Sequence, residues 1–229
     1  ERIGSLILVR DIADLKRKEK ALLTKDATIR EVHHRVKNNL QTVAALLRLQ
    51  ARRAKSNETK ESLEEAQRRV SAIAVVHEAL SKTPGEVVPF DEVISQVIAL
   101  VKDAAAALEN AYPIEINQIG DFGELPTEVA TPLAMAVVEI LQNAIEHGRP
   151  TNEPVELQVV KSGGQIRITI SDGGPGIAKD FDVFNTDQLG LQIVRTLIVD
   201  ELGGKLTVSA NTPNGLKVEV VAPIVIKKV

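Results

Sequence analysis

Residues 131–148, TPLAMAVVEILQNAIEHG, predict the central helix of the second half of this chain. Thr131 is expected as the helix cap and Pro132 at the first helical position, and Gly148 ends the helix. Glu139, Asn143 and His147 are spaced four residues apart and therefore share one face. An apolar face lies beside them, made by Leu133, Val137, Ile140 and Ala144. A carboxamide one turn from a carboxylate can hold Mg²⁺ through oxygen atoms, but a solvated polar face explains the same pattern.

Short strands and helices surround this central helix. Helices are predicted over residues 90–109 and 186–202. Strands are predicted over residues 114–119, 155–160, 165–171, 205–209 and 216–223. Glycine-containing turns join the last four strands into two hairpins. The predicted fold is an α/β sandwich, in which one mixed sheet carries its helices on one face.

The first half of the chain has a different pattern. A short strand is predicted over residues 3–11, followed by a helix over 12–53 that contains no Pro or Gly. Apolar residues recur in it every seven positions, at Leu15, Leu22, Ile29, Val36 and Val43. A second helix with an apolar stripe follows over 58–82. Because two such helices cannot bury their stripes alone, we expect this α-helical hairpin to form a dimeric four-helix bundle. Thr83-Pro84-Gly85 marks the expected domain boundary.

Composition excludes several classes of protein. The 229 residues are 44% apolar and 26% charged, which is typical of a globular chain with one or two cores. No apolar stretch is long enough to predict a membrane span, and the pattern of the first residues does not predict a signal peptide. The absence of Cys excludes thiolate chemistry and fits a cytoplasmic location. With only 2% aromatic residues, a stacking surface for single-stranded nucleic acid is not expected.

Charge is divided unevenly along the chain. Residues 1–85 hold 18 Lys and Arg against 11 Asp and Glu, whereas residues 86–229 hold 10 against 20. Basic and acidic residues alternate around the predicted helices, as on solvated faces, so that DNA binding is not expected. An acidic protein partner of the basic half is the other interpretation.

Two adjacent histidines stand in the first predicted helix. His34 lies on its outward face, where a neutral imidazole is accessible to an incoming donor. Glu31 and Asn38 share that face and can hold the ring by hydrogen bonds. His33 is one step closer to the apolar seam. An exposed histidine without a role explains this segment equally well.

Two glycine-containing segments follow strands of the second half. In the first, Ser171 to Gly176, Asp172 stands where a strand ends and can accept a hydrogen bond from an exocyclic amine such as that of adenine. The segment is not a Walker A loop because no Gly-Lys-Ser/Thr follows it, and an ordinary turn remains the alternative. In the second, Gly190 opens a helix whose free N–H groups can receive phosphate. Residues 179–187 between them are expected to form a lid.

Together, in this order and spacing, these segments resemble the sensor histidine kinases of two-component systems over residues 25–224. Glu139-x-x-x-Asn143 is similar to their N box, and Asp172-x-Gly174-x-Gly176 to their first glycine box. Gly190-Leu191 is similar to the second glycine box. The stretch from His34 to Asn39 resembles the phosphoacceptor box of the HRVKN branch, a sister group of the HWE kinases.

The resemblance implies a domain order. Residues 1–14 would be the end of a PAS-like sensor domain, and residues 15–30 a signalling coiled-coil helix. Residues 31–83 would form the dimerisation and histidine phosphotransfer domain. Residues 86–229 would form a catalytic ATP-binding domain of the GHKL (Bergerat) fold. The implied partners are a second copy of the chain, the receiver domain of a response regulator and an upstream PAS-type sensor.

The resemblance also implies a role for individual residues. His34 would accept the γ-phosphoryl group of ATP and pass it to an aspartate of the regulator, with Glu139 as the base or as a residue that orients water. Asn143 would bind Mg²⁺ together with the phosphates. The remaining ATP-binding positions would be His147, Asp172, Gly174, Gly176, Gly190 and Leu191.

Two positions depart from the family pattern. Arg35 stands where many histidine kinases have a carboxylate, and Gln188 stands where the second glycine box has its first Gly. A non-catalytic dimeric scaffold that binds nucleotide, or another GHKL ATPase or kinase, therefore remains as an alternative.

Overall fold

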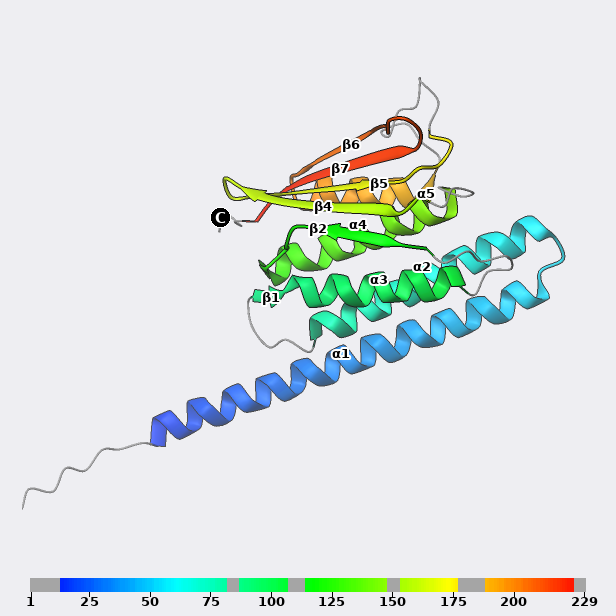
Figure 1. The fold of residues 1–229 in the computed structure, drawn as a ribbon. Coiled ribbons are helices and arrows are strands. Elements are labelled where there is room, and N and C mark those ends of the chain that lie inside the picture. The colour runs from blue at the N-terminus through cyan, green and yellow to red at the C-terminus, as the bar shows by residue number, and fades with distance from the viewer. Residues whose placement is uncertain (1–12, 82–86, 107–113, 148–152, 177–187, 225–229) are drawn as a thin grey trace, which may run out of the picture.

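The computed structural model describes residues 13–81, 87–106, 114–147, 153–176 and 188–224. Within these ranges the side chains of residues 13–30, His33, His34, Ser81 and His147 are not described. The predicted strand at 3–11, the boundary at 83–85 and the expected lid at 179–187 all lie outside the described residues. The described chain forms a long helical hairpin followed by an α/β unit (Figure 1).

The hairpin consists of α1 (Ala13–Arg53) and α2 (Asn57–Ser81), which confirms both predicted helices. Lys37 Nζ lies 2.7 Å from the Glu78 carboxylate and marks the antiparallel register. Small residues such as Ala44 of α1 are buried. By contrast, Val43 of the predicted seven-residue row is 43% exposed, and Leu46 three residues further along α1 is 55% exposed. Val36 of the same row is half-buried, and the side chains of Leu15, Leu22 and Ile29 lie outside the described residues.

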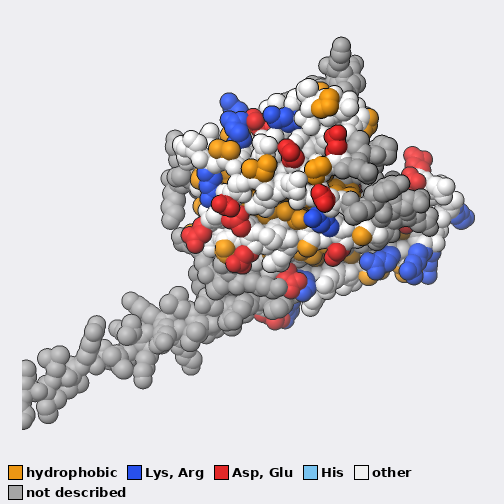
Figure 2. All heavy atoms as spheres, viewed as in Figure 1, with side chains coloured by type: hydrophobic (Ala, Val, Ile, Leu, Met, Phe, Trp, Pro, Cys, Tyr) orange, Lys and Arg blue, Asp and Glu red, His pale blue; other side chains and the backbone are white. Residues whose placement is uncertain are grey.

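Basic side chains gather on the hairpin near its turn, where the last turn of α1 carries Arg52 and Arg53 (Figure 2). The carbonyl end of a helix carries partial negative charge, which favours cations there. Some of the basic residues that are in excess in the first half therefore stabilise the end of a helix.

The α/β unit is built from eleven segments in the described part of the chain. Its helices are α3 (Phe90–Ala106), α4 (Thr127–His147), α5 (Leu189–Arg195) and the π-helical turn η1 (Thr196–Glu201). Its strands are β1 (Val87–Pro89), β2 (Ile116–Ile119), β3 (Glu124–Pro126), β4 (Val155–Ser162), β5 (Gln165–Ser171), β6 (Lys205–Ala210) and β7 (Leu216–Pro223).

Five strands form one mixed sheet in the order β2-β4-β5-β7-β6, with β2 parallel to β4 and the other pairs antiparallel. The helices lie on one face of this sheet, which confirms the predicted α/β sandwich (Figure 1). Alternate residues of β5, namely Ile166, Ile168 and Ile170, are buried against them. Strands β1 and β3 pair as a separate two-stranded sheet that the sequence did not predict.

The predicted start of the central helix is wrong. α4 begins at Thr127, directly after β3, and Thr131 Oγ1 donates a hydrogen bond to the Thr127 carbonyl at 3.2 Å from inside the helix. Pro132 therefore lies within α4. It removes only the bond to the carbonyl of Glu128, which lies in an exposed first turn where water can replace it. A proline near a helix start need not stand at its first position.

One described helix has the length and apolar composition of a membrane span, residues 127–146 of α4. Most of this segment is buried inside the fold, because α4 packs between the sheet and α3. Its apolar face, predicted from Leu133, Val137, Ile140 and Ala144, is buried as expected.

The hairpin and the α/β unit share one apolar core. Ala72, Val76, Ala79 and Leu80 of α2 are buried in the same cluster as Val93 and Val97 of α3. α2 therefore packs on α1 with one face and on the α/β unit with another.

Truncation of Phe122 tests the core of the α/β unit. Phe122 is fully buried, and its ring centroid lies 5.1 Å from that of Phe90. We expect Phe122→Ala to lower the free energy of unfolding in urea by about 3–5 kcal/mol. Val160→Ala, at a position 57% exposed, is the control and should change it by less than about 0.5 kcal/mol. Equal effects of both variants would contradict this packing.

Candidate functional site

Asp172 stands at the end of β5 and is only 7% exposed. Its Oδ1 accepts hydrogen bonds from the backbone N–H of Gly174 at 2.8 Å and of Leu216 at 3.1 Å. These bonds fix the carboxylate on the first glycine segment. Among the described residues none bonds the other carboxylate oxygen, which is therefore available to a ligand donor.

A small pocket of about 30 Å³ lies beside Asp172. Apolar side chains from α4, β5, α5 and β7 make most of its wall, and polar groups come from Asp172, Asn143 and Gln188. The apolar lining residues are Ile140, Ala144, Ile170, Leu191, Leu216 and Val218. Apolar walls with a few polar groups are typical of a site for a flat ring. The structure thus brings Asn143, Asp172 and Leu191 together around one pocket.

The predicted glycines lie around the same region. Gly190 is buried at the start of α5, and a Cβ there would lie 3.1 Å from Glu139 Oε2 and 3.3 Å from Asn143 Nδ2. Gly176 has φ +76°, which favours glycine. Gly174 is buried in the loop that bonds Asp172.

Two residues of the β6–β7 turn also hold Asp172, and the sequence did not predict this. Asn211 Nδ2 donates to the Asp172 carbonyl at 2.9 Å. Gly215 has φ +106°, and a Cβ there would collide with the same carbonyl oxygen. The only sequence signal is a glycine-containing turn at Pro213-Asn214-Gly215, which predicts a hairpin but not a contact with Asp172.

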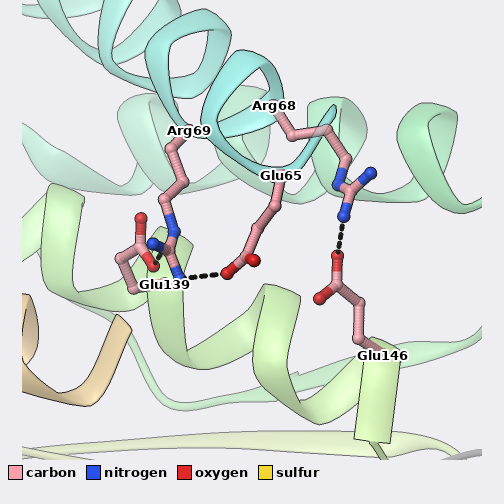
Figure 3. Close-up of polar contacts among 5 residues, drawn as sticks. All are labelled: Glu65, Arg68, Arg69, Glu139 and Glu146. Carbon is pink, nitrogen blue, oxygen red and sulfur yellow. Dashed lines mark hydrogen bonds and ion pairs between the residues drawn. The ribbon is translucent and has the colours of Figure 1, made fainter. Parts of the chain in front are cut away.

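Glu139 lies on the side of α4 that faces the hairpin. Its Oε2 is 3.2 Å from Arg69 Nε of α2, and the two side chains are only 9% and 12% exposed. Arg69 also contacts Glu65 at 2.5 Å, and next to it Arg68 pairs with Glu146 at 3.0 Å. Figure 3 shows Arg69 and Arg68 of α2 reaching Glu139 and Glu146 of α4, with Glu65 beside Arg69 on α2. No sequence pattern predicts these contacts, because both arginines belong to a helix that is rich in charge.

Burial raises the pKa of the Glu139 carboxyl above its ordinary value of 4.5. The neighbouring Arg69 lowers this pKa in part, while the carboxylates of Glu65 and Glu146 add to the increase. A carboxylate with a raised pKa is a stronger base than an exposed one.

The backbone of His34 lies in α1, but the side chains of His34 and His147 are outside the described part of the structure. Glu31, which was expected beside His34, pairs with Arg35 Nε at 2.7 Å on the exposed face. The described residues therefore do not show which groups hold the His34 ring.

The residues around Asn143 offer few groups that could bind a metal ion. Among the described side chains, no group of three or more His, Cys, Asp or Glu can hold a metal ion. Asn143 and Glu139 supply one amide and one carboxylate a helical turn apart. Such a small donor set fits Mg²⁺ that takes its other ligands from phosphates and water.

Two family models match the chain. Residues 31–105 match a model described as histidine kinase, and residues 128–226 match the histidine kinase-, DNA gyrase B- and HSP90-like ATPases. Sensor histidine kinase PdtaS of Mycobacterium tuberculosis (strain H37Rv) is 45% identical over 225 residues, which cover 97% of this chain. The chain belongs to the histidine kinase family. The resemblance found in the sequence is thereby confirmed, including the GHKL fold of the second part.

Solved structures agree with this assignment of the histidine kinase. The histidine kinase domain of the blue-light activated kinase EL346 of Erythrobacter litoralis superposes with a TM-score of 0.58 at 27% identity. The match covers 87% of this chain and 92% of that domain. The chain spans 44% of the length of PdtaS and 54% of Blue-light-activated histidine kinase 2 of E. litoralis, which is 29% identical. It is thus about half as long as the curated relatives that it matches.

The raised pKa of Glu139 predicts how stability depends on pH. The folded chain holds the Glu139 proton to a higher pH than the unfolded chain does. This contribution to the free energy of unfolding is complete below the ordinary value of 4.5 and is lost as pH rises through the raised pKa. Relative to Glu139→Gln, which does not titrate here, the wild type should therefore lose stability as pH rises. Urea unfolding from about pH 4 to about pH 7 measures this difference in the free energy of unfolding. A wild type that becomes more stable relative to Glu139→Gln as pH rises would refute the prediction.

Proposed function

We propose that this histidine kinase core transfers the γ-phosphoryl group of ATP to His34 and then to an aspartate of a response regulator in a two-component system. The observation that supports it most is the meeting of Asp172 and Asn143 in one pocket, with Glu139 one turn away on α4. The same chain carries His34 on a separate helical hairpin. A nucleotide site and an acceptor on two different units are what such a transfer needs.

The proposed nucleotide site uses the contacts described above. Asp172, fixed through Oδ1 by two backbone N–H groups, offers its other oxygen to the exocyclic amine of adenine. The apolar pocket wall takes the ring. Asn143 and Gly190 lie where the phosphates would follow, with His147 and the glycines of the first loop completing the site. Mg²⁺ bound with ATP would neutralise phosphate charge, and Asn143 is its proposed protein ligand.

The chemistry follows from these groups. The unprotonated ring nitrogen of His34 attacks the γ-phosphorus, the bond to the β–γ bridging oxygen breaks, and ADP leaves with that electron pair. The other ring nitrogen loses its proton, and Glu139 is the proposed acceptor. In the second step a regulator carboxylate attacks the phosphorus and the P–N bond breaks. The imidazole then regains a proton.

Domain roles and assembly complete the proposal. Residues 31–83 form the dimerisation and phosphotransfer domain, and residues 86–229 the catalytic domain. Residues 1–14 are the end of a PAS-like sensor domain, and residues 15–30 are a signalling coiled-coil helix. The exposed seam residues Val32, Val43, Leu46 and Leu49 on α1 support a homodimer, because they are 42–55% exposed along one helix. A cytoplasmic location fits the absence of Cys.

Phosphorylation of His34 is the decisive prediction. With γ-labelled ATP and Mg²⁺, the wild type should take up label that is stable in base and lost in acid, as a phosphoimidazole is. His34→Gln should reduce the label by about 100-fold or more, because it removes the attacking nitrogen. His33→Gln is the matched control and should keep most of it.

Other outcomes favour the alternatives. Nucleotide binding without label would favour a non-catalytic scaffold, which the Glu31–Arg35 pair beside His34 motivates. Label that survives acid would favour another GHKL kinase.

The seam gives a prediction for assembly. Leu46→Lys places a charge in the proposed dimer contact and should shift the chain from dimer to monomer in sedimentation at micromolar concentration. Its monomeric fold should persist, because Leu46 is already 55% exposed. Val160→Lys, at an equally exposed position on β4, is the control and should leave the dimer intact. A wild type that is monomeric under these conditions would exclude the homodimer.

A further inference from the structure

Arg69 is the buried residue of the site that the proposed function does not use. It comes from α2, yet its guanidinium lies against Glu139 of α4. A Cβ on Gly190 would lie 3.1 Å from Arg69 Nη2, 3.1 Å from Glu139 Oε2 and 3.3 Å from Asn143 Nδ2. A cation from the hairpin thus stands where the N box and the second glycine box meet.

We infer that Arg69 competes with ATP-Mg for this site: while Arg69 is docked on Glu139, the catalytic domain is held in a resting position, and nucleotide binding displaces it. This inference rests on the proposed function, because it takes the region of Asn143 and Asp172 as the ATP site. The competition makes the α2–α4 contact a regulatory latch within one chain.

Space is the first argument. The pocket between Asp172 and Asn143 measures about 30 Å³. Pockets that bind a nucleotide-sized ligand measure roughly 300–1,000 Å³. The groups around the pocket therefore have to move apart before a nucleotide can enter. Arg69 and Gly190 stand at the Asn143 end, where the phosphates would follow the adenine.

Charge is the second argument. Arg69 and Mg²⁺ are both cations, and both would be neutralised by the Glu139 and Asn143 end of the site. In the docked state the Glu139 carboxylate is already paired with Arg69 at 3.2 Å, and Glu65 holds a second guanidinium nitrogen. Two cations beside the one Glu139 carboxylate repel each other. Mg²⁺ brought to Asn143 with ATP therefore favours release of Arg69 from Glu139.

Distance is the third argument. Lys37 and Glu78 mark one level of the hairpin. Arg69 lies nine residues before Glu78 on α2, and His34 lies three residues before Lys37 on the antiparallel α1, farther from Arg69. Twelve residues at about 1.5 Å each separate Arg69 from the level of His34 by about 18 Å along the axis.

Transfer needs the reacting atoms about 3–3.5 Å apart. A nucleotide held beside Glu139 in the docked position would be far beyond that distance from His34. The docked position is therefore a resting state, and transfer requires the catalytic domain to move along the hairpin toward His34. Arg68 and Glu146, paired at 3.0 Å, reinforce the same position from the neighbouring turn.

Removal of the arginine tests the latch. Arg69→Ala should bind a fluorescent ATP analogue about fivefold more tightly or better, and should be labelled on histidine faster by a similar factor, because binding no longer has to displace the side chain. Weaker binding or slower labelling would overturn the inference and make Arg69 a ligand of the phosphates. Unchanged values would overturn it as well.

Glu65→Gln is the second variant, because Arg69→Ala leaves the Glu139 carboxylate buried without its partner. Glu65 has a side chain that is 44% exposed and contacts Arg69 but not the proposed nucleotide site, so that its loss loosens Arg69 without disturbing the fold. It should change affinity and labelling rate in the same direction by a smaller factor. Opposite signs in the two variants would refute the latch. Lys60→Gln, which removes an exposed cation paired at 3.9 Å with Glu64 on the same helix, is the control and should match the wild type.

The behaviour of the wild type distinguishes a failure of the proposed function from a failure of the latch alone. If it neither binds the analogue nor is labelled at histidine, the proposed function itself fails. If it does both and Arg69→Ala is indistinguishable from it, only the latch fails.

Discussion

The arrangement of this histidine kinase depends on one helix having to bury two faces. α2 contacts α1 along one side, and along another it buries Ala72, Val76, Ala79 and Leu80 against α3. A helix normally presents one apolar stripe to one core. Because α2 serves two, the hairpin that carries His34 and the unit that carries the proposed nucleotide site have a defined mutual position, and α2 makes most of the described contacts between them.

The two buried carboxylates, Asp172 and Glu139, are stabilised by different kinds of group. Asp172 is stabilised by backbone N–H groups of its own unit, at Gly174 and Leu216, so that its geometry does not depend on the hairpin. Glu139 relies on Arg69, a side chain of the other unit. Movement between the units therefore leaves Asp172 unchanged but alters the charge environment of Glu139. The adenine end of the proposed site is thus fixed, and the phosphate end responds to how the units are docked.

The sequence predicted what is encoded locally. The hairpin helices and the four strands of the two β-hairpins carry clear periodicity, and the N box and glycine boxes have fixed spacings. The start of α4 was misplaced, because Pro132 is a typical first helical residue and nothing local reveals β3 before it. The β1–β3 pair was missed, since strands of three residues have no period to detect. The Arg69–Glu139 pair joins residues seventy positions apart, and the Asn211–Asp172 bond also depends on the tertiary fold.

The small side chains on α2 have a consequence for how firmly the units are docked. Ala72 and Ala79 give the helix a shallow surface on the side that packs against α3, so that few ridges interlock there. Ion pairs at the edge of that surface, such as Arg68 with Glu146, add to the contact made by the apolar core. The Arg68 and Glu146 side chains are about one-third exposed and are within reach of dissolved ions. The stability of the docked arrangement should therefore fall as ionic strength rises.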